Sequence, residues 1–177
     1  MNHNAIPMDF KRSFTVRKPV DAVWEVLGNQ FGQACAWASG LHHSEVSARR
    51  GDRPTHRACT ADFGDLKEEV LRFDPDEYVL AYRVLEGFPG FVDSGVNHWR
   101  LTGLPDGTTR VDMHLRIVTK GLVGAVMSPM MRMQMNGLTK QIVEDFTVYL
   151  ETGRPSAKKA KELAKLRKNQ SDPAVAA

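Results

Sequence analysis

Apolar side chains recur every three or four positions in the last third of the chain, between residues 128 and 150. The residues that share this face are Met131, Met135, Leu138, Ile142, Phe146 and Tyr149. The opposite face is mostly polar, and Ser128 followed by Pro129 is typical of a helix N-terminus. The pattern predicts an amphipathic helix over residues 128–150, about 33 Å long at the usual helical rise.

The apolar face of this predicted helix changes in composition along its length. Its first half is rich in methionine, whereas isoleucine, phenylalanine, tyrosine and leucine make up the second half. Flexible thioethers suit a space whose contents vary, and branched or aromatic side chains suit a fixed core. Two interpretations follow: the methionines border a cavity, or they fill gaps in a wholly packed core.

The chain before this helix consists of short apolar segments separated by turn signals. Residues 10–16 are predicted to form a strand, Pro19 then opens a short helix, and a second helical piece covers 31–37. Further strands are predicted at 41–48, 55–61, 66–73 and 78–85, with a hairpin over 97–118. This order predicts an α+β fold: a curved, seven-stranded antiparallel sheet around a long C-terminal helix, with two short helices after the first strand.

The hairpin permits a prediction of register. Pro105-Asp106-Gly107 fits a three-residue connection with Gly107 in the left-handed conformation, which places Leu104 opposite Thr108. Counting outward gives Asn97–Leu115, Trp99–Met113 and Leu101–Val111 on one face, and His98–His114 and Arg100–Asp112 on the other. The first set is apolar and is predicted to be covered, while the second is polar and is predicted to face water.

Length and composition fit one domain. The chain has 177 residues, 42% of them apolar, which is enough for one hydrophobic core. We expect an N-terminal extension over residues 1–9, a domain over 10–153, and a basic tail over 154–177 that is partly disordered. Neither a signal peptide nor a run of about 18 apolar residues is visible, so we expect a cytoplasmic protein without a membrane span.

The net charge of +3 is unevenly distributed. The tail carries seven Lys or Arg against Glu162 and Asp172, so it is strongly basic while the rest of the chain is slightly acidic. With only Leu163 and Leu166 to bury, the tail is predicted to form a frayed, solvent-exposed helix with disorder from Asn169. A nucleic-acid or acidic-membrane arm is the alternative, and the lack of aromatic residues among the bases disfavours nucleic acid.

Cysteine and histidine spacing offers no metal site. Cys35 and Cys59 are too few and too far apart for a disulfide framework or a paired-cysteine metal site, so free buried thiols are expected. His98 and His114 lie opposite each other, but no carboxylate or thiol is spaced to complete a zinc site, and surface imidazoles are expected. We therefore predict no metal and no organic cofactor.

Several short motifs occur in a fixed order over residues 10–150. They are Pro19 with Val23-Trp24, Trp37, Thr55-x-Arg57, Gly64-x-Leu66-x-Glu68 with Asp74, Tyr82-x-Val84 and Gly107-x-Thr109. With these motifs the chain resembles the SRPBCC superfamily, whose helix-grip fold occurs in START domains, the birch-pollen allergen, plant abscisic-acid receptors and bacterial polyketide cyclase/dehydrase-like proteins. The resemblance implies a sheet that grips the C-terminal helix, with an apolar cavity between them. Carriers, receptors and enzymes share this fold, so no single activity is implied.

The resemblance and strand alternation, together with the apolar loop at 86–94 and the methionine-rich half of the helix, predict which side chains bind a ligand in this cavity. The predicted residues are His42, Arg57, Cys59, Glu68, Tyr82, Phe88, Asn97, Trp99, Met113, Met131 and Met135. Trp99 suits a cavity wall or a packed core. In the hormone-receptor branch the position of Glu68 contacts ligand through water. The Ser-Gly-Leu-Pro gate of those receptors is replaced here by Asp62-Phe63-Gly64-Asp65, so hormone sensing is not implied.

Glu68 is the candidate residue with the widest range of possible roles. A carboxylate in an apolar cavity must be neutralised, solvated or paired, and Arg57 on the neighbouring strand is an available partner. Glu68 then contacts a polar group of the ligand, acts as a general acid or base with Tyr82 or Asn97, or forms a purely structural pair with Arg57. For ligand contact, we expect Glu68→Gln to alter affinity and to leave thermal stability nearly unchanged.

Three functions are compatible with these features. The first is binding of a small hydrophobic or amphipathic molecule, such as a lipid, polyketide or aromatic metabolite, for transport or sensing. The second is a cofactor-free cyclase or dehydratase, a lyase with Glu68 and Tyr82 as its acid/base pair. The third is a protein-interaction module that docks through the basic tail. A nucleic-acid partner is not expected, and a homodimer is compatible with all three.

Overall fold

The computed structural model describes residues 5–170, with side chains as far as Lys168. Its strands are β1 (Ile6–Val16), β2 (Leu41–Arg50), β3 (Arg53–Ala61), β4 (Gly64–Asp74), β5 (Val79–Glu86), β6 (Val92–Gly103) and β7 (Thr109–Thr119). Its helices are α1 (Val20–Trp24), a π-helical turn η1 (Glu25–Asn29), a 3₁₀ segment η2 (Phe31–Ala36), α2 (Gly121–Thr152) and α3 (Ala157–Gln170).

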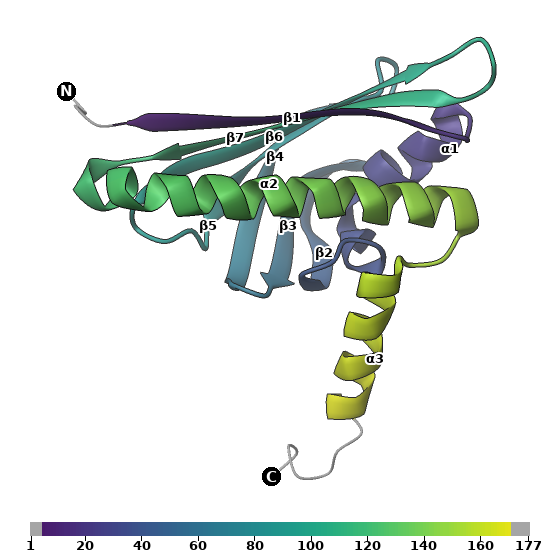
Figure 1. Cartoon of the computed structure of the whole chain (residues 1–177). Helices are drawn as coiled ribbons and strands as arrows, with labels where there is room; N and C mark the ends of the chain where they lie inside the picture. Colours follow the sequence, from purple (N-terminus) through teal and green to yellow (C-terminus); the bar gives the residue numbers. More distant parts are fainter. Residues whose placement is uncertain (1–4, 171–177) are drawn as a thin grey trace.

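The seven strands form one antiparallel sheet in the order β1-β7-β6-β5-β4-β3-β2. Each strand from β3 to β7 pairs with the strand before it, and β1 pairs with β7. Figure 1 shows the sheet bending around α2, which runs along β1 and across the inner face. The α+β helix-grip fold predicted from the sequence is therefore confirmed, including the short helices between β1 and β2.

The hairpin of β6 and β7 has the predicted register. Trp99 lies opposite Met113, and every other pair named from the sequence is found as well. The amide of Leu104 donates to the carbonyl of Thr108 at 2.8 Å, and Gly107 has φ +79°, so the turn is of the expected kind. A one-residue slip would have moved Trp99 and Met113 to the outer face, and both are buried.

β1 begins earlier than the sequence pattern indicated. It starts at Ile6, and Met8 lies opposite Ile117 of β7 and is fully buried. Residues 6–9, predicted to belong to an N-terminal extension, therefore pair within the sheet. Pro7 obscured this start because proline lacks the N–H that most strand positions use, although an edge strand such as β1 tolerates it.

α2 also begins earlier, at Gly121, so the prediction that Ser128 caps the helix is wrong. The Ser128 hydroxyl donates to the Gly124 carbonyl at 2.6 Å and lies 3.1 Å from the Thr119 hydroxyl. Pro129 lies inside the helix, where its ring removes one N–H donor. The true start was concealed because residues 121–127 are apolar on nearly every side and show no helical periodicity.

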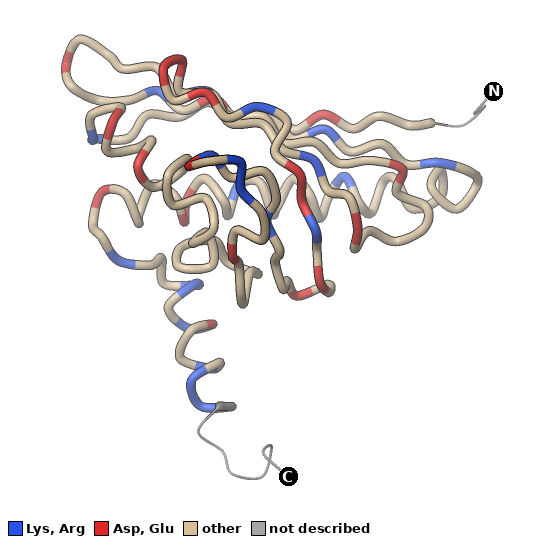
Figure 2. Tube along the Cα trace, turned by 180° about the vertical axis from the view of Figure 1, so that it is seen from behind, with Lys and Arg blue, Asp and Glu red and all other residues tan. Residues whose placement is uncertain are grey.

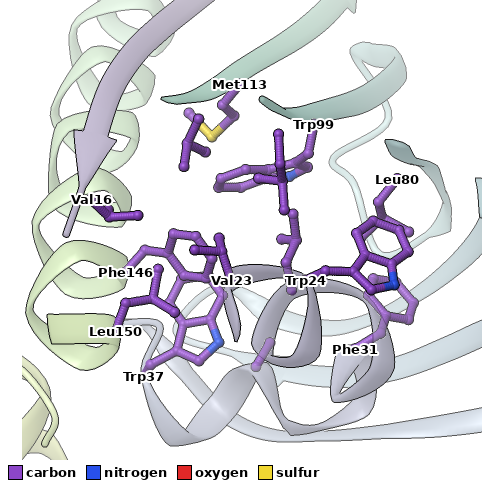
Figure 3. Close-up of a cluster of buried hydrophobic side chains, with 14 of the residues drawn as sticks. Val16, Val23, Trp24, Phe31, Trp37, Leu80, Trp99, Met113, Phe146 and Leu150 are labelled. Carbon is purple, nitrogen blue, oxygen red and sulfur yellow. The ribbon is translucent and has the colours of Figure 1, made fainter. Parts of the chain in front are cut away.

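The second half of α2 belongs to a closely packed core (Figure 3). The Phe146 ring is fully buried, with its centroid 4.8 Å from that of Trp37 and 5.6 Å from that of Trp99. Leu150 and Met113 are buried in the same cluster. This cluster joins the helix, the sheet and the segment around η2, and it closes one end of the space between sheet and helix.

α3 is a better anchored helix than the sequence predicted. Lys159 in its first turn is fully buried and donates to the Leu41 carbonyl at 2.5 Å, while Glu162 accepts from the amide of Gly40 at 2.9 Å. The prediction of a frayed, solvent-exposed helix is therefore wrong for this turn. Hydrogen bonds to the backbone of residues 40 and 41 anchor the turn, although it buries little apolar surface. The remaining basic side chains are exposed, and Figure 2 shows them along α3.

The predicted disorder from Asn169 falls mostly outside the described residues, since α3 continues to Gln170 and residues 171–177 are not described. Within residues 5–170, no helix is long and apolar enough to cross a membrane.

Candidate functional site

A cavity of about 440 Å³ lies between the sheet and the first half of α2. Four thioethers line it on the helix side: Met127, Met130, Met131 and Met135. Apolar side chains from the strands line the other side: Leu66, Val84, Leu115 and Ile117. Small-molecule sites commonly have volumes of roughly 300–1,000 Å³ and mainly apolar walls, so this cavity has suitable size and character.

The change in side-chain type along α2 explains where the cavity lies. In the second half of the helix, the Phe146 ring fills the space against Trp37 and Trp99. In the first half, flexible methionines approach the sheet without filling that space. This is the first of the two arrangements that the composition of the helix suggested.

The mouth of the cavity lies between α2 and two connections of the sheet. Among the lining residues, Phe63 in the β3–β4 turn is 58% exposed and Met130 of α2 is 44% exposed. Phe88 from the β5–β6 loop also lines the cavity, and its ring packs over Gly95. A Cβ atom at Gly95 would lie 2.5 Å from that ring, so glycine is needed for this close approach.

A buried ion pair forms one polar part of the wall. Arg57 Nε donates to Glu68 Oε2 at 2.6 Å, and the two residues lie directly opposite each other on β3 and β4. Arg57 also donates to the Phe31 carbonyl at 2.9 Å, and its guanidinium lies 3.9 Å from the centre of the Phe31 ring. Burial is the largest single effect and would lower the pKa of Arg57, but the charge and hydrogen bond of Glu68, together with Tyr82 and Cys59, outweigh it and raise that pKa.

This pairing changes the expectation for Glu68→Gln. Both side chains are almost completely buried, so removing the carboxylate would leave the Arg57 charge uncompensated in the interior. The expectation that thermal stability would stay nearly unchanged is therefore not supported by this geometry. The pair also holds one oxygen of Glu68 against a permanent cation.

Tyr82 and Asn97 form a second polar group on the neighbouring strands. They lie opposite each other on β5 and β6, and Asn97 Nδ2 donates to the Tyr82 hydroxyl at 3.1 Å. Burial raises the pKa of Tyr82, so its hydroxyl stays protonated at neutral pH. Asn97 Oδ1 and Trp99 Nε1 are buried without a hydrogen-bond partner among the described residues. This end of the cavity therefore has one acceptor and one donor that could form hydrogen bonds with a ligand.

The structure brings together eight of the eleven residues predicted to contact a ligand. Those lining the cavity are Arg57, Glu68, Tyr82, Phe88, Asn97, Trp99, Met131 and Met135. Cys59 lies behind this wall, with its thiol 3.7 Å from Glu68 Oε2. Met113 belongs to the packed core, and His42 pairs with Asp62 at 2.8 Å instead of lining the cavity. Strand alternation predicts which residues lie on the inner face of the sheet, but it does not predict which part of that face borders the cavity.

Among the contributions that the sequence reasoning missed, two are polar. Phe31 supplies both a carbonyl and a ring to Arg57, and a buried arginine is itself a signal that such partners exist. Asp145 is fully buried beside the cavity wall and accepts from the amide of Ser39 at 2.7 Å. No sequence signal distinguishes Asp145 from the exposed Glu144 next to it, apart from its place beside Phe146 on the helix.

Among the residues that the structure describes, no group of three or more His, Cys, Asp or Glu side chains is arranged to hold a metal ion. His98 and His114 face each other as expected, and His114 Nε2 lies 2.7 Å from Asp9 Oδ1 on β1.

Comparisons with known proteins agree with this geometry. A family model described as polyketide cyclase / dehydrase and lipid transport matches residues 7–151. A START superfamily protein from Mycobacterium smegmatis superimposes with a TM-score of 0.65 at 13% identity, covering 80% of this chain and 96% of that one. Norcoclaurine synthase from Thalictrum flavum gives 0.65 at 11% identity, with 83% and 96% covered. Ara h 8.0201 gives 0.58 at 16% identity, with 81% and 97% covered. No curated protein matches the chain in sequence at a significant level.

Proposed function

The chain belongs to the polyketide cyclase / dehydrase and lipid transport family of the SRPBCC superfamily, and from this premise we propose that it binds a small apolar or amphipathic molecule between the sheet and α2. The observation that carries the proposal is the cavity of about 440 Å³ with four thioethers on one wall. Families of this kind typically bind hydrophobic ligands or act as cyclases. Apolar walls make transfer of an apolar molecule out of water favourable.

The hydrogen-bonding end of the cavity supports a ligand with one polar group. Asn97 Oδ1 can accept a hydrogen bond, and the Trp99 indole N–H and the Tyr82 hydroxyl can donate one. A hydroxyl group on the ligand can satisfy such a mixed set, because it both donates and accepts. We therefore favour an amphipathic ligand whose hydroxyl lies near Asn97 and whose apolar body lies along the methionines.

Catalysis by Glu68 receives less support than binding. One oxygen of Glu68 is already held by the buried guanidinium of Arg57 at 2.6 Å, so that oxygen is not free to contact a substrate. Tyr82 keeps its proton but accepts a hydrogen bond from Asn97, which suits it better to hold a ligand in place. We accordingly propose a carrier or sensor role ahead of the cyclase or dehydratase alternative.

Dye uptake tests whether the cavity binds apolar molecules. N-phenyl-1-naphthylamine should become fluorescent with wild-type protein, and Leu138→Trp should reduce its affinity at least about tenfold because the larger side chain occupies cavity volume. Lys140→Trp is the matched control, since Lys140 is exposed on the same helix. Equal dye affinity in wild type and Leu138→Trp would contradict the proposal.

A pair of ligands that differ by one hydroxyl tests the polar end. 4-Octylphenol should bind wild type about tenfold more tightly than octylbenzene, and Asn97→Leu should abolish most of this preference. Binding of octylbenzene should change little in the variant, because its apolar contacts remain. Equal affinity of wild type for both compounds would contradict the proposed hydrogen bond to a ligand hydroxyl. The ligand would then be expected to be purely apolar.

A further inference from the structure

The first half of α2 exposes a stripe of apolar side chains to solvent. The stripe consists of Leu122, Val126, Met130 and Met133, which are 78%, 78%, 44% and 72% exposed. Their spacing of four, four and three residues places them along one side of the helix. Val123, 60% exposed, lies beside Leu122 and widens the stripe near the start of α2.

This stripe is a local property of the helix. The outward positions of the second half are polar, as at Asn136, Lys140 and Glu144, which is the usual character of a helix face in contact with water. Scattered exposed apolar residues are normal, but a contiguous stripe of large ones marks a surface that something covers. α3 does not cover it, since α3 extends from the opposite end of α2 (Figure 1).

The stripe is continuous with the mouth of the cavity. Met130 belongs to both, because it is exposed and also lines the cavity. Phe63 on the other side of the mouth is 58% exposed. Whatever covers the stripe therefore also faces the entrance through which an apolar ligand would pass.

The charged residues of the helix segment that carries the stripe are basic. No Asp or Glu occurs between residues 119 and 143, whereas Lys120, Arg132 and Lys140 lie in that segment. Lys120 is engaged by Asp93 at 3.3 Å, but Arg132 is exposed and makes no ion pair or hydrogen bond within the described residues. Large aliphatic side chains with an unpaired cation among them suit an anionic lipid surface.

We propose that this stripe docks on a phospholipid bilayer and places the mouth of the cavity against it. A specific protein partner would be expected to use aromatic anchors and hydrogen-bonding groups, and the stripe offers neither. Docking of this kind lays α2 in the interface, in keeping with its lack of a membrane-spanning segment. The inference rests on the exposed face of α2 and holds whether or not the cavity accepts the ligands tested above.

Vesicle flotation tests the proposal. Full-length protein should float with vesicles of phosphatidylcholine and phosphatidylglycerol, and Val126→Glu or Met133→Glu should weaken binding at least about tenfold, because each removes a large apolar contact and adds a negative charge. Arg132→Gln should weaken binding to these vesicles about fivefold and leave binding to pure phosphatidylcholine unchanged. Leu85→Glu is the matched control, because Leu85 is 46% exposed on β5, away from the stripe.

The outcomes separate this proposal from others. Uptake of N-phenyl-1-naphthylamine should be unchanged in Val126→Glu and Met133→Glu, which shows that these variants fold and that the cavity is intact. Absence of wild-type protein from the floated vesicles, or equal binding by wild type, Val126→Glu and Leu85→Glu, would overturn the proposal. So would a wild-type dimer that Val126→Glu dissociates, seen by light scattering, if no vesicle binding accompanies it, because the stripe would then join two copies.

Discussion

Arg57 and Glu68 show how two charges can be kept in an apolar interior. Each is nearly inaccessible to water, and the geometry compensates with a 2.6 Å contact, a backbone carbonyl and the faces of two aromatic rings. Such a pair contributes little net stability, because desolvation offsets the attraction, but breaking it is costly. The pair therefore holds β3, β4 and η2 in place at the polar end of the cavity.

Glu68→Gln is expected to lower the free energy of unfolding by about 3 kcal/mol, because it leaves the Arg57 charge buried and unpaired. Urea unfolding followed by circular dichroism measures this change. Glu69→Gln is the matched control, since Glu69 pairs with Arg83 at the surface and should cost less than about 1 kcal/mol. If both variants lowered the free energy of unfolding by similar amounts, the buried pair would not have the structural importance proposed here.

The thiol of Cys59 is expected to be unreactive in the folded protein. Burial raises its pKa from 9.0 to about 12, so the thiolate is scarce at pH 8. Iodoacetamide should modify Cys59 only when the protein unfolds, as measured by mass spectrometry of its peptides. Rapid alkylation of the folded protein at pH 8 would show that Cys59 is accessible.

The same pKa shift affects stability at high pH. Because the pKa of Cys59 is higher in the folded state, the protonated thiol contributes stability below pH 9.0 that is lost as pH rises toward 12.

At the scale of the elements, α2 is divided into two parts with different neighbours. Its second half packs through Phe146 on two tryptophans, and its first half borders the cavity and exposes the apolar stripe. Asp145 fastens the packed part to the rest of the chain, because its carboxylate accepts from the Ser39 amide, the Gln141 side chain and the Ser156 hydroxyl. One buried side chain thereby joins α2, the start of α3 and the segment before β2.

Asp145→Ala is expected to lower the free energy of unfolding by about 2–3 kcal/mol, because it leaves buried donors at Ser39 and Ser156 without an acceptor. The same change should loosen α3, so limited proteolysis should cut within residues 157–170 sooner than in wild type. Glu144→Ala controls for the loss of a carboxylate on α2, since Glu144 is exposed. A stability equal to that of Glu144→Ala would mean that α3 is not held by this contact.

At the scale of the whole molecule, one end is a solid core and the other is a cavity enclosed by flexible side chains. The core holds three tryptophans and Phe146, whereas the open end is lined by methionines and bordered by connecting loops. Regions with few buried contacts open locally at low free-energy cost, and ligand-binding segments are commonly of this kind. The methionine-lined cavity can therefore adapt to its contents, while the packed core keeps the sheet and α2 in place.

Hydrogen exchange should report this difference. Amides of residues 125–135 are expected to exchange faster than those of 142–150, because the second segment is held by Phe146 and Leu150 in the core. Binding of N-phenyl-1-naphthylamine should slow exchange in 125–135 and leave 142–150 unchanged. Uniform protection along α2 would contradict the division of the helix into a packed and an open half.

Much of the fold was predictable because its signals are local. The turn at Gly107 and the alternation on either side of it set the register of β6 and β7, which the structure reproduces pair by pair. The starts of β1 and α2 were missed where the local pattern is interrupted, at Pro7 and in the apolar run 121–127. The inward placement of Glu68, Tyr82 and Asn97 followed from alternation and the family resemblance.

The sequence by itself determined the order of the elements, the facing of their side chains and the presence of methionine on one half of the last helix, since periodicity and turn chemistry depend on near neighbours. Only the tertiary structure decided that the space beside those methionines is open, that Met113 is core while Asn97 lines the cavity, and that Lys159 is buried. These outcomes depend on how volumes from distant segments fit together, and no stretch of sequence contains that information alone.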